Sequence, residues 1–508
     1  MSGKSYKWTL AAVAAALFFG VSRVQWALTT DREVLGLNIY TELRGAPPVL
    51  ALTTVALGGF RGLISNMLWM RASDLQDQDK FFEMVQLADW ITKLEPHYAQ
   101  VWVVQAWNMA FNISVKFNDP EDRWRWVKRG IELLRDEGLK YNPYNVLIHR
   151  ELGWIFQFKM GDNLDDANEY YKMEWAQEMS SVFEGDKPDW DELIHPTTED
   201  ARRRSNLLRE RYKMDPAFMK QVDDTYGPLE WRLPETHAIY WAMKGLDAAK
   251  QNERMVDPDT LIQLHRLVYQ SMQLAFRRGR IIRIGTGPNG GMLNLAPNLA
   301  LIGQVNKAYE DVISNETAKY QFDLGNAHRY LLMDAVYFFY TYGREADAMR
   351  WYKYLAEKYP DKTMLPGRED SLPGKMSLDE YAIARIQDEV NTLGQNKTEA
   401  VIRGLEQMSL LNLAEGDNER AQGLDAMAGK IYQKYEAKIL PGVNNTNRLY
   451  IPTPRETRRT VVNDLLVPGV LQPEDAAALA TQLGITNLPA ANVPANASTN
   501  TAPGIQGP

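Results

Sequence analysis

The chain of 508 residues contains no cysteine. Disulfide bonds, thiolate nucleophiles and cysteine-ligated zinc are therefore excluded. An excess of basic residues is missing too, because 57 Lys and Arg stand against 65 Asp and Glu, a net charge of −8. A nucleic-acid-binding domain would need a strongly basic face. We therefore expect no nucleic-acid partner.

Strand patterns and catalytic motifs are scarce. Alternation occurs over five residues, Arg280–Ile284, enough for half of a hairpin at most. The six histidines include no pair four residues apart and no H-E-x-x-H motif, and no G-x-S-x-G motif marks a serine nucleophile. The acidic stretch from Asp186 to Glu192 lacks the residue order of a calcium loop. We expect no catalytic residue, no cofactor and no metal site, and an enzyme is not the reading that we favour.

Helical spacing dominates what is present, and the best stretch is Tyr330–Asp361. Gly343 falls in a turn, Ala348 and Tyr352 fall on the second helix, and Pro360 ends the unit. This spacing resembles the tetratricopeptide repeat (TPR) family, whose unit has about 34 residues. The resemblance implies antiparallel helix pairs stacked side by side, and a role in protein–protein interaction.

Divergent units surround this stretch, and they are marked by helix-ending prolines, small residues at close helix contacts and turn glycines. The repeat-defining positions are Pro96, Trp102, Ala106, Pro143, Gly153, Gly343, Ala348, Tyr352, Pro360, Gly416 and Ala421. We therefore predict an all-α fold, a right-handed α-solenoid of stacked antiparallel helix pairs with one N-terminal hydrophobic helix. The many aromatic residues, with 14 Trp and 24 Tyr, are expected first as core.

The N-terminus carries the longest uncharged apolar run. Lys4 and Lys7 precede Trp8–Ser22, and apolar residues continue beyond Arg23. A spanning helix needs about 20 residues, whereas a signal peptide has a shorter apolar core and a small-x-small cleavage site. No convincing site follows the run, so we favour a retained anchor over a cleaved signal or a buried soluble helix. The lysines before the span give a mild charge bias, which predicts that the body lies on the extracytoplasmic, periplasmic side.

The pattern divides the chain into six parts. These are a signal-anchor or transmembrane helix (1–30), N-terminal TPR-like repeats (31–180), a helical region with loop insertions (181–320), C-terminal TPR-like repeats (321–440), a linker with a short helix (441–484) and a disordered tail (485–508). The tail has no charged side chain and little apolar surface to bury.

Two basic stretches are candidate contact sites. Arg277, Arg278, Arg280 and Arg283 precede a turn with Gly285, Gly287 and Gly290, which could direct backbone N–H groups at an anion or dock a partner. The turn lacks the Gly-Lys-Ser/Thr of a P-loop, so a flexible surface loop stays an alternative. The second stretch, from Arg202 to Lys213, is interspersed with acids and is typical of a solvated, salt-bridged helix face.

Three functions fit these observations. The first is a membrane-anchored TPR-like scaffold that binds a membrane-associated protein or peptide, as an accessory subunit of an envelope assembly or transport complex. The alternative is an envelope carbohydrate- or polymer-binding protein or enzyme that uses exposed aromatics and the segment 277–291; it needs exposed rings among Trp102, Trp124, Trp126, Trp154 and Trp175. A cytosolic adaptor with an N-terminal docking helix is the third.

Overall fold

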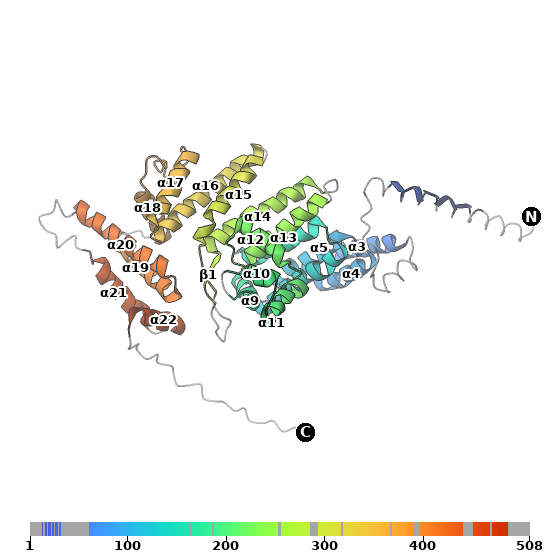
Figure 1. Ribbon diagram of the computed structural model, residues 1–508, viewed down its shortest axis with the longest axis horizontal. Helices are drawn as coiled ribbons and strands as arrows, with labels where there is room; N and C mark the ends of the chain where they lie inside the picture. Colours follow the sequence, from blue (N-terminus) through green and yellow to red (C-terminus); the bar gives the residue numbers. More distant parts are fainter. Residues whose placement is uncertain are drawn as a thin grey trace, which may run out of the picture. The chain divides into compact units, whose positions relative to one another are not determined.

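The computed structural model describes residues 60–485, except 163, 185–186, 252–255, 285–292, 316–317, 366–367, 391–396, 440–450 and 468–469, together with part of 13–31. The described residues are mostly helical, which confirms the all-α class (Figure 1). The chain divides into two compact units, Met1–Tyr98 and Ala99–Pro508.

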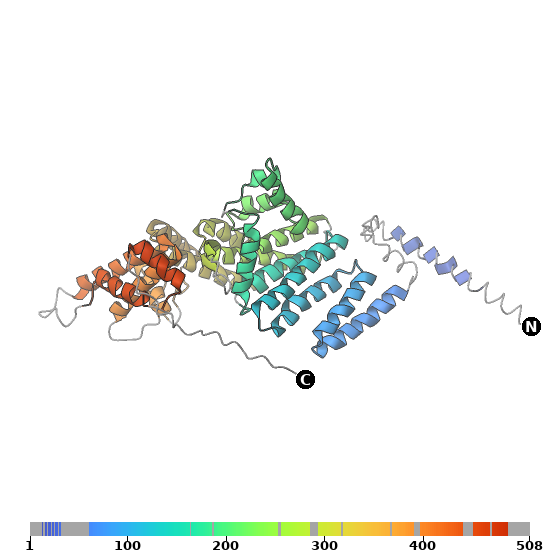
Figure 2. The same cartoon turned by 90° about the horizontal axis from the view of Figure 1, so that it is seen from below.

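The first unit contains a helix pair, α3 (Phe60–Asp77) and α4 (Phe81–Leu94), which lie side by side (Figure 2). Met84, Ala88 and Ile91 are buried on α4 at the spacing of one helical face. Ala72 and Leu75 are buried on α3. Helix α4 ends at Leu94, two residues before Pro96, where the lost backbone N–H of proline costs no helical hydrogen bond.

Most of the predicted anchor, residues 1–30, lies outside the described residues. The described residues between 13 and 31 are helical, and side chains such as Leu17 and Phe19 are exposed. Among the residues that the structure describes, no helix has both the length and the apolar content that crossing a membrane requires.

The second unit begins with helices that are repeatedly interrupted by π-helical turns. In chain order they are α5 (Ala99–Trp107), the π-helix η1 (Asn108–Ile113), the 3-10 turn η2 (Ser114–Lys116), α6 (Pro120–Glu132), the π-helix η3 (Leu133–Gly138), α7 (Leu139–Tyr141), α8 (Val146–Trp154), the π-helix η4 (Ile155–Gly161), α9 (Asn168–Ser180), α10 (Trp190–Ile194), α11 (Glu199–Asn206) and the π-helix η5 (Leu207–Arg211). Helix α10 falls within 181–320, for which the sequence pattern predicted a helical region with loop insertions.

Longer helices follow and pack largely on their chain neighbours. They are α12 (Pro216–Tyr226), α13 (Pro234–Gln251), α14 (Pro258–Arg278), the 3-10 turn η7 (Leu299–Leu301), α15 (Ile302–Asn315), α16 (Ala318–Thr341), α17 (Glu345–Lys358), α18 (Leu378–Val390), α19 (Lys397–Glu415) and α20 (Asn418–Ile439). Helix α13 packs on α14 and on α8, α16 packs on α17, and α19 packs on α20. At Gly153 an added Cβ would lie 3.2 Å from the carbonyl oxygen of Ala238, so α8 and α13 cross closely there.

The remaining repeat-defining positions lie in turns and on buried helix faces. Pro143 falls between α7 and α8, and Pro360 follows α17. Gly343 has φ +69° between α16 and α17, and Gly416 has φ +98° between α19 and α20, a backbone region that favours glycine. The other side chains of the set in this unit are buried: Trp102, Ala106, Ala348, Tyr352 and Ala421.

Aromatic rings fill much of the core of the second unit, as expected. The ring centroid of Trp175 lies 5.0 Å from that of Phe156 and 4.9 Å from that of His237, with edge-to-face geometry. A charged cluster is buried beside them. Asp165 accepts a hydrogen bond from Arg123 at 2.7 Å and pairs with Lys159, and all three side chains are nearly inaccessible.

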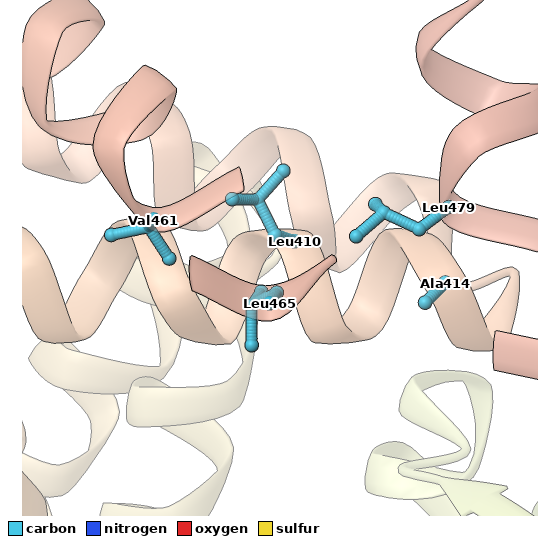
Figure 3. Close-up of a cluster of buried hydrophobic side chains, with 5 residues drawn as sticks. All are labelled: Leu410, Ala414, Val461, Leu465 and Leu479. Atoms are coloured by element: carbon cyan, nitrogen blue, oxygen red, sulfur yellow. The ribbon is translucent and has the colours of Figure 1, made fainter. Parts of the chain in front are cut away.

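Two C-terminal helices cover α19, although the sequence pattern predicted only one short helix in 441–484. Helices α21 (Pro454–Leu465) and α22 (Pro473–Leu483) both pack on α19. Figure 3 shows the shared cluster, in which Leu410 and Ala414 of α19 meet Val461 and Leu465 of α21 and Leu479 of α22. The missed helix α21 begins with a capping box, in which Thr453 and Glu456 bond each other's backbone N–H groups.

One antiparallel hairpin joins distant parts of the second unit. Its strands are β1 (Arg280–Ile284), the predicted alternating stretch, and β2 (Leu293–Ala296), with a register shift between Ile281 and Arg283. From β1, Arg280 donates to both carboxylate oxygens of Asp417 at 3.2 Å. The hairpin is thereby tied to the turn between α19 and α20.

Candidate binding site

The second unit has a pocket of about 340 Å³ where three parts of the chain meet. One part of its lining is the turn between α7 and α8, with Pro143 and Tyr144, and another is the stretch of α13 from Trp241 to Gln251. Lys213, between η5 and α12, stands at a third side. Trp241 is buried and Tyr144 is half exposed, so the lining includes one enclosed and one accessible aromatic ring.

The charged side chains that line the pocket are mainly basic. Arg135 is neutralised by its neighbour Asp136, with Nε to Oδ1 at 2.6 Å and Nη2 to Oδ2 at 2.8 Å. Three lysines and one further carboxylate remain: Lys140, Lys213, Lys244 and Asp247. The lining thus has an excess of two positive charges in a protein whose net charge is −8.

None of these three lysines forms an ion pair with a residue that the structure describes. Lys244 lies over aromatic rings instead, with its ammonium 4.0 Å from the centroid of Phe218. Lys140 lies 5.8 Å from the ring centroid of Tyr141. Cation–π contacts of this kind orient an ammonium group without cancelling its charge. No described carboxylate therefore offsets the charge of these three lysines.

Lys213 has a backbone conformation that side-chain-bearing residues rarely adopt, with φ +53°. It occupies the residue after a helix end, where glycine or asparagine is usual. The conformation is fixed from both sides, since the Tyr212 amide donates to the Leu207 carbonyl at 3.2 Å and the Met214 amide to that of Leu208 at 2.9 Å. The chain thus holds an exposed lysine where a glycine would be less strained.

His149 contributes shape to the pocket but no charge. Its Nδ1 donates to the carbonyl of Asn145 at 2.8 Å, and its ring lies 6.1 Å from that of Trp241. Burial lowers the pKa of His149 to about 4, outweighing the backbone hydrogen bond. The imidazole is therefore neutral at pH 7, and the charge of the pocket rests on lysines.

A separate apolar surface lies on α3 in the first unit. Leu63, Met67 and Met70 expose 52%, 56% and 61% of their surfaces and follow one another at intervals of four and three residues. This spacing places them in one strip along the helix. We call this strip the α3 apolar row. An apolar strip of this kind on a helix is suited to contact another apolar surface.

The predicted arginine cluster is brought together, but its described side chains are already engaged. Arg277 pairs with Asp334 at 2.6 Å, and Arg280 pairs with Asp417. Arg278 donates to the carbonyl of Gly161 and lies 3.5 Å from a carboxylate oxygen of Glu235. Arg283 lies in β1, and Gly285, Gly287 and Gly290 lie outside the described residues. An anion at this segment would therefore compete with carboxylates of the chain itself.

The second basic stretch is a salt-bridged face, as predicted. Arg203 and Arg204 both pair with Asp200, at 2.7 and 2.8 Å. Arg209 pairs with Asp215, and Arg211 pairs with Glu178. Lys213, which the sequence pattern grouped with this face, belongs to the pocket instead. The pocket lysines carry no local sequence signal, because they come from helices and a turn far apart in the chain.

The aromatic residues needed by the carbohydrate alternative are largely enclosed. Trp102, Trp124 and Trp175 are buried. Trp126 and Trp154 are partly exposed, but each ring stacks on a neighbour, Trp126 on Phe117 and Trp154 on Phe158. Most of the proposed sugar platform is thus used as core.

Within the described part of the chain, no group of three or more His, Asp or Glu side chains is placed to hold a metal ion. No protein-family model matches the chain, and no curated protein matches it either.

Proposed function

We propose that this protein is a membrane-anchored, TPR-like helical scaffold that binds another membrane-associated protein. In this proposal the helix pairs form a right-handed α-solenoid, and the segment 1–30 holds the body at the membrane on its extracytoplasmic side. The consecutive pairing of α3 with α4, α13 with α14, α16 with α17 and α19 with α20 supports the repeat architecture. We propose that the protein acts as an accessory subunit of an envelope assembly or transport complex.

The observation that carries the binding role is the α3 apolar row. A terminal helix pair in a repeat array needs a polar outer face to remain soluble, whereas α3 exposes Leu63, Met67 and Met70. The row is one helix face wide, and the two methionines are flexible enough to fit a partner surface closely. An amphipathic helix of a partner protein is the occupant that fits such a strip, by packing its own apolar face against the row.

Site-specific photocrosslinking in native membranes tests this proposal. A photoreactive amino acid replaces Met67 in the full-length protein, and the matched control replaces Gln76, an exposed residue nine positions further along α3 and therefore on its opposite side. We expect a protein adduct from position 67 and not from position 76. The substitution Met67→Asp should deplete the same protein from co-purification, because a charged side chain would be desolvated in the contact.

Two outcomes would contradict the proposal. One is an adduct with lipid alone from position 67, which would make the row a membrane contact. The other is the same set of adducts from positions 67 and 76, which would make the crosslinking non-specific.

A further inference from the structure

We propose that the pocket formed by the α7–α8 turn, Lys213 and α13 binds a compact organic anion, a small molecule with phosphate or carboxylate groups on an apolar or planar body. This site lies in the second unit and shares no residue with the α3 apolar row. The inference is thus independent of the proposed protein partner.

Charge is the first support. Lys140, Lys213 and Lys244 converge on one pocket without ion pairs to described residues, although acidic residues outnumber basic ones in the chain. Like charges brought together destabilise the folded state unless a counter-charge is present. A bound anion would supply that counter-charge.

The backbone of Lys213 is the second support. A left-handed conformation in a non-glycine residue is strained, and such strain gathers at functional sites. Glycine at this position would relieve the strain but remove the ammonium group. The hydrogen bonds of the Tyr212 and Met214 amides fix the backbone of Lys213 in this conformation. A lysine at this strained position is explained if its ammonium group contacts a ligand.

Shape and donor type identify the ligand class. A volume of about 340 Å³ is at the lower end of the range for small-molecule pockets, roughly 300–1,000 Å³. Its lining comes from the segment 135–149, from Lys213 and from α13, and a space of this volume holds a compact molecule rather than an extended chain. The unpaired donors are lysines, which act as point charges toward phosphate or carboxylate, while the one arginine is engaged with Asp136. The exposed ring of Tyr144 can lie against the body of the ligand.

The test uses the full-length protein in detergent, with pyrophosphate and citrate as probes in separate titrations followed by calorimetry. We expect at least one probe to bind with one site per chain, and binding to weaken as salt is added. The variant Lys213→Gly should bind roughly three- to tenfold more weakly, since one charge contact is lost. The same variant should unfold at the same or a higher temperature without ligand, because glycine relieves the positive φ.

Two further variants make the result specific. Lys140→Gln with Lys244→Gln should weaken binding more than Lys213→Gly alone. Lys353→Gln, which removes an exposed lysine of α17, should leave binding unchanged. Whether pyrophosphate or citrate binds more tightly distinguishes a phosphate from a carboxylate ligand.

Three results would overturn the inference. The first is binding of neither probe. The second is equal loss of binding in Lys213→Gly and Lys353→Gln, which would show non-specific charge attraction. The third is binding that Lys213→Gly weakens only for anionic lipid vesicles or polyglutamate and not for the small probes, which would assign the lysines to a membrane or to an acidic protein segment.

Discussion

The buried side chain of Glu406 links two of the C-terminal helices, α19 and α21. Glu406 of α19 is fully buried, and its Oε2 accepts a hydrogen bond from Arg458 of α21 at 2.8 Å. The same guanidinium donates to Ser409 Oγ at 2.9 Å and to Asp425 at 3.4 Å. Burial raises the pKa of Glu406 to about 7, and the nearby carboxylate of Asp425 adds to this, while the hydrogen bond and charge of Arg458 oppose it.

This raised pKa predicts that Glu406 contributes less to the stability of the folded state at pH 7 than at pH 4.5. The folded protein binds the proton of Glu406 more tightly than the unfolded chain, whose pKa is near 4.5. The stability contribution is therefore fully present below pH 4.5 and is lost as the pH rises to about 7. Glu406→Gln should flatten this part of the stability profile, measured as the thermal unfolding midpoint of the full-length protein across that pH range.

The matched control for this measurement is Glu357→Gln, an exposed carboxylate of α17. It should retain the wild-type pH profile. An identical profile in the Glu406→Gln variant and the wild-type protein would refute the assignment of the pH dependence to Glu406.

Helix-to-helix contacts depend on glycine at one crossing in particular. An added Cβ on Gly423 of α20 would lie 2.3 Å from the carbonyl oxygen of Thr341 and 2.7 Å from the amide nitrogen of Gly343. Both atoms belong to the backbone at the turn between α16 and α17, so neither can rotate away. Helix α20 thus lies directly against this turn.

Gly423→Ala should therefore destabilise the protein by about 2–3 kcal/mol, as expected for overpacking against a rigid backbone. The control is Gly429→Ala on the same helix, where an added Cβ meets nothing within 4 Å. This change should stabilise the protein by about 0.5–1 kcal/mol, because alanine favours the helix. Chemical denaturation of both variants checks the opposite signs, and a neutral Gly423→Ala would mean that the two elements can separate at low cost.

The helix-ending prolines and turn glycines were predictable because each acts through its own backbone. Pro96, Pro143 and Pro360 lie outside helices, and Gly343 and Gly416 adopt positive φ. The spacing of apolar and small residues was less informative about helix packing between residues 108 and 211. In this part of the chain the π-helices η1, η3, η4 and η5 interrupt the α-helices. A π-helical turn adds a residue and rotates the following face, so a template with fixed offsets loses its register there.

The predicted membrane anchor in residues 1–30 determines where the whole protein is found in the cell. Extraction of membranes with salt tests this prediction. Full-length protein should remain with the membrane in about 1 M salt, because hydrophobic insertion, unlike surface attraction, is not screened by ions. A variant that lacks residues 2–30 should appear in the soluble fraction. Release of the full-length protein by salt alone would refute the anchor and favour a peripheral adaptor.

The candidate pocket was beyond prediction because its chemistry is assembled only by folding. Lys140, Lys213 and Lys244 belong to three different segments, and none occurs in a motif. The reverse holds for Arg277 and Arg280, which form a conspicuous cluster in the sequence but are neutralised by Asp334 and Asp417 in the fold. A cluster of basic residues in the sequence therefore did not indicate which basic side chains would lack an ion-pair partner in the folded protein.

The bond between Arg280 and Asp417 joins residues 137 positions apart. During synthesis, the hairpin leaves the ribosome long before the α19–α20 turn is made. Arg280 therefore cannot pair with Asp417 until that turn has been synthesised. Helix pairs that form through neighbouring contacts, such as α13 with α14, can assemble in the meantime. The ion pair between Arg280 of β1 and Asp417 therefore forms late in the synthesis of the protein. A chain that ends before Asp417 would lack this contact of the hairpin.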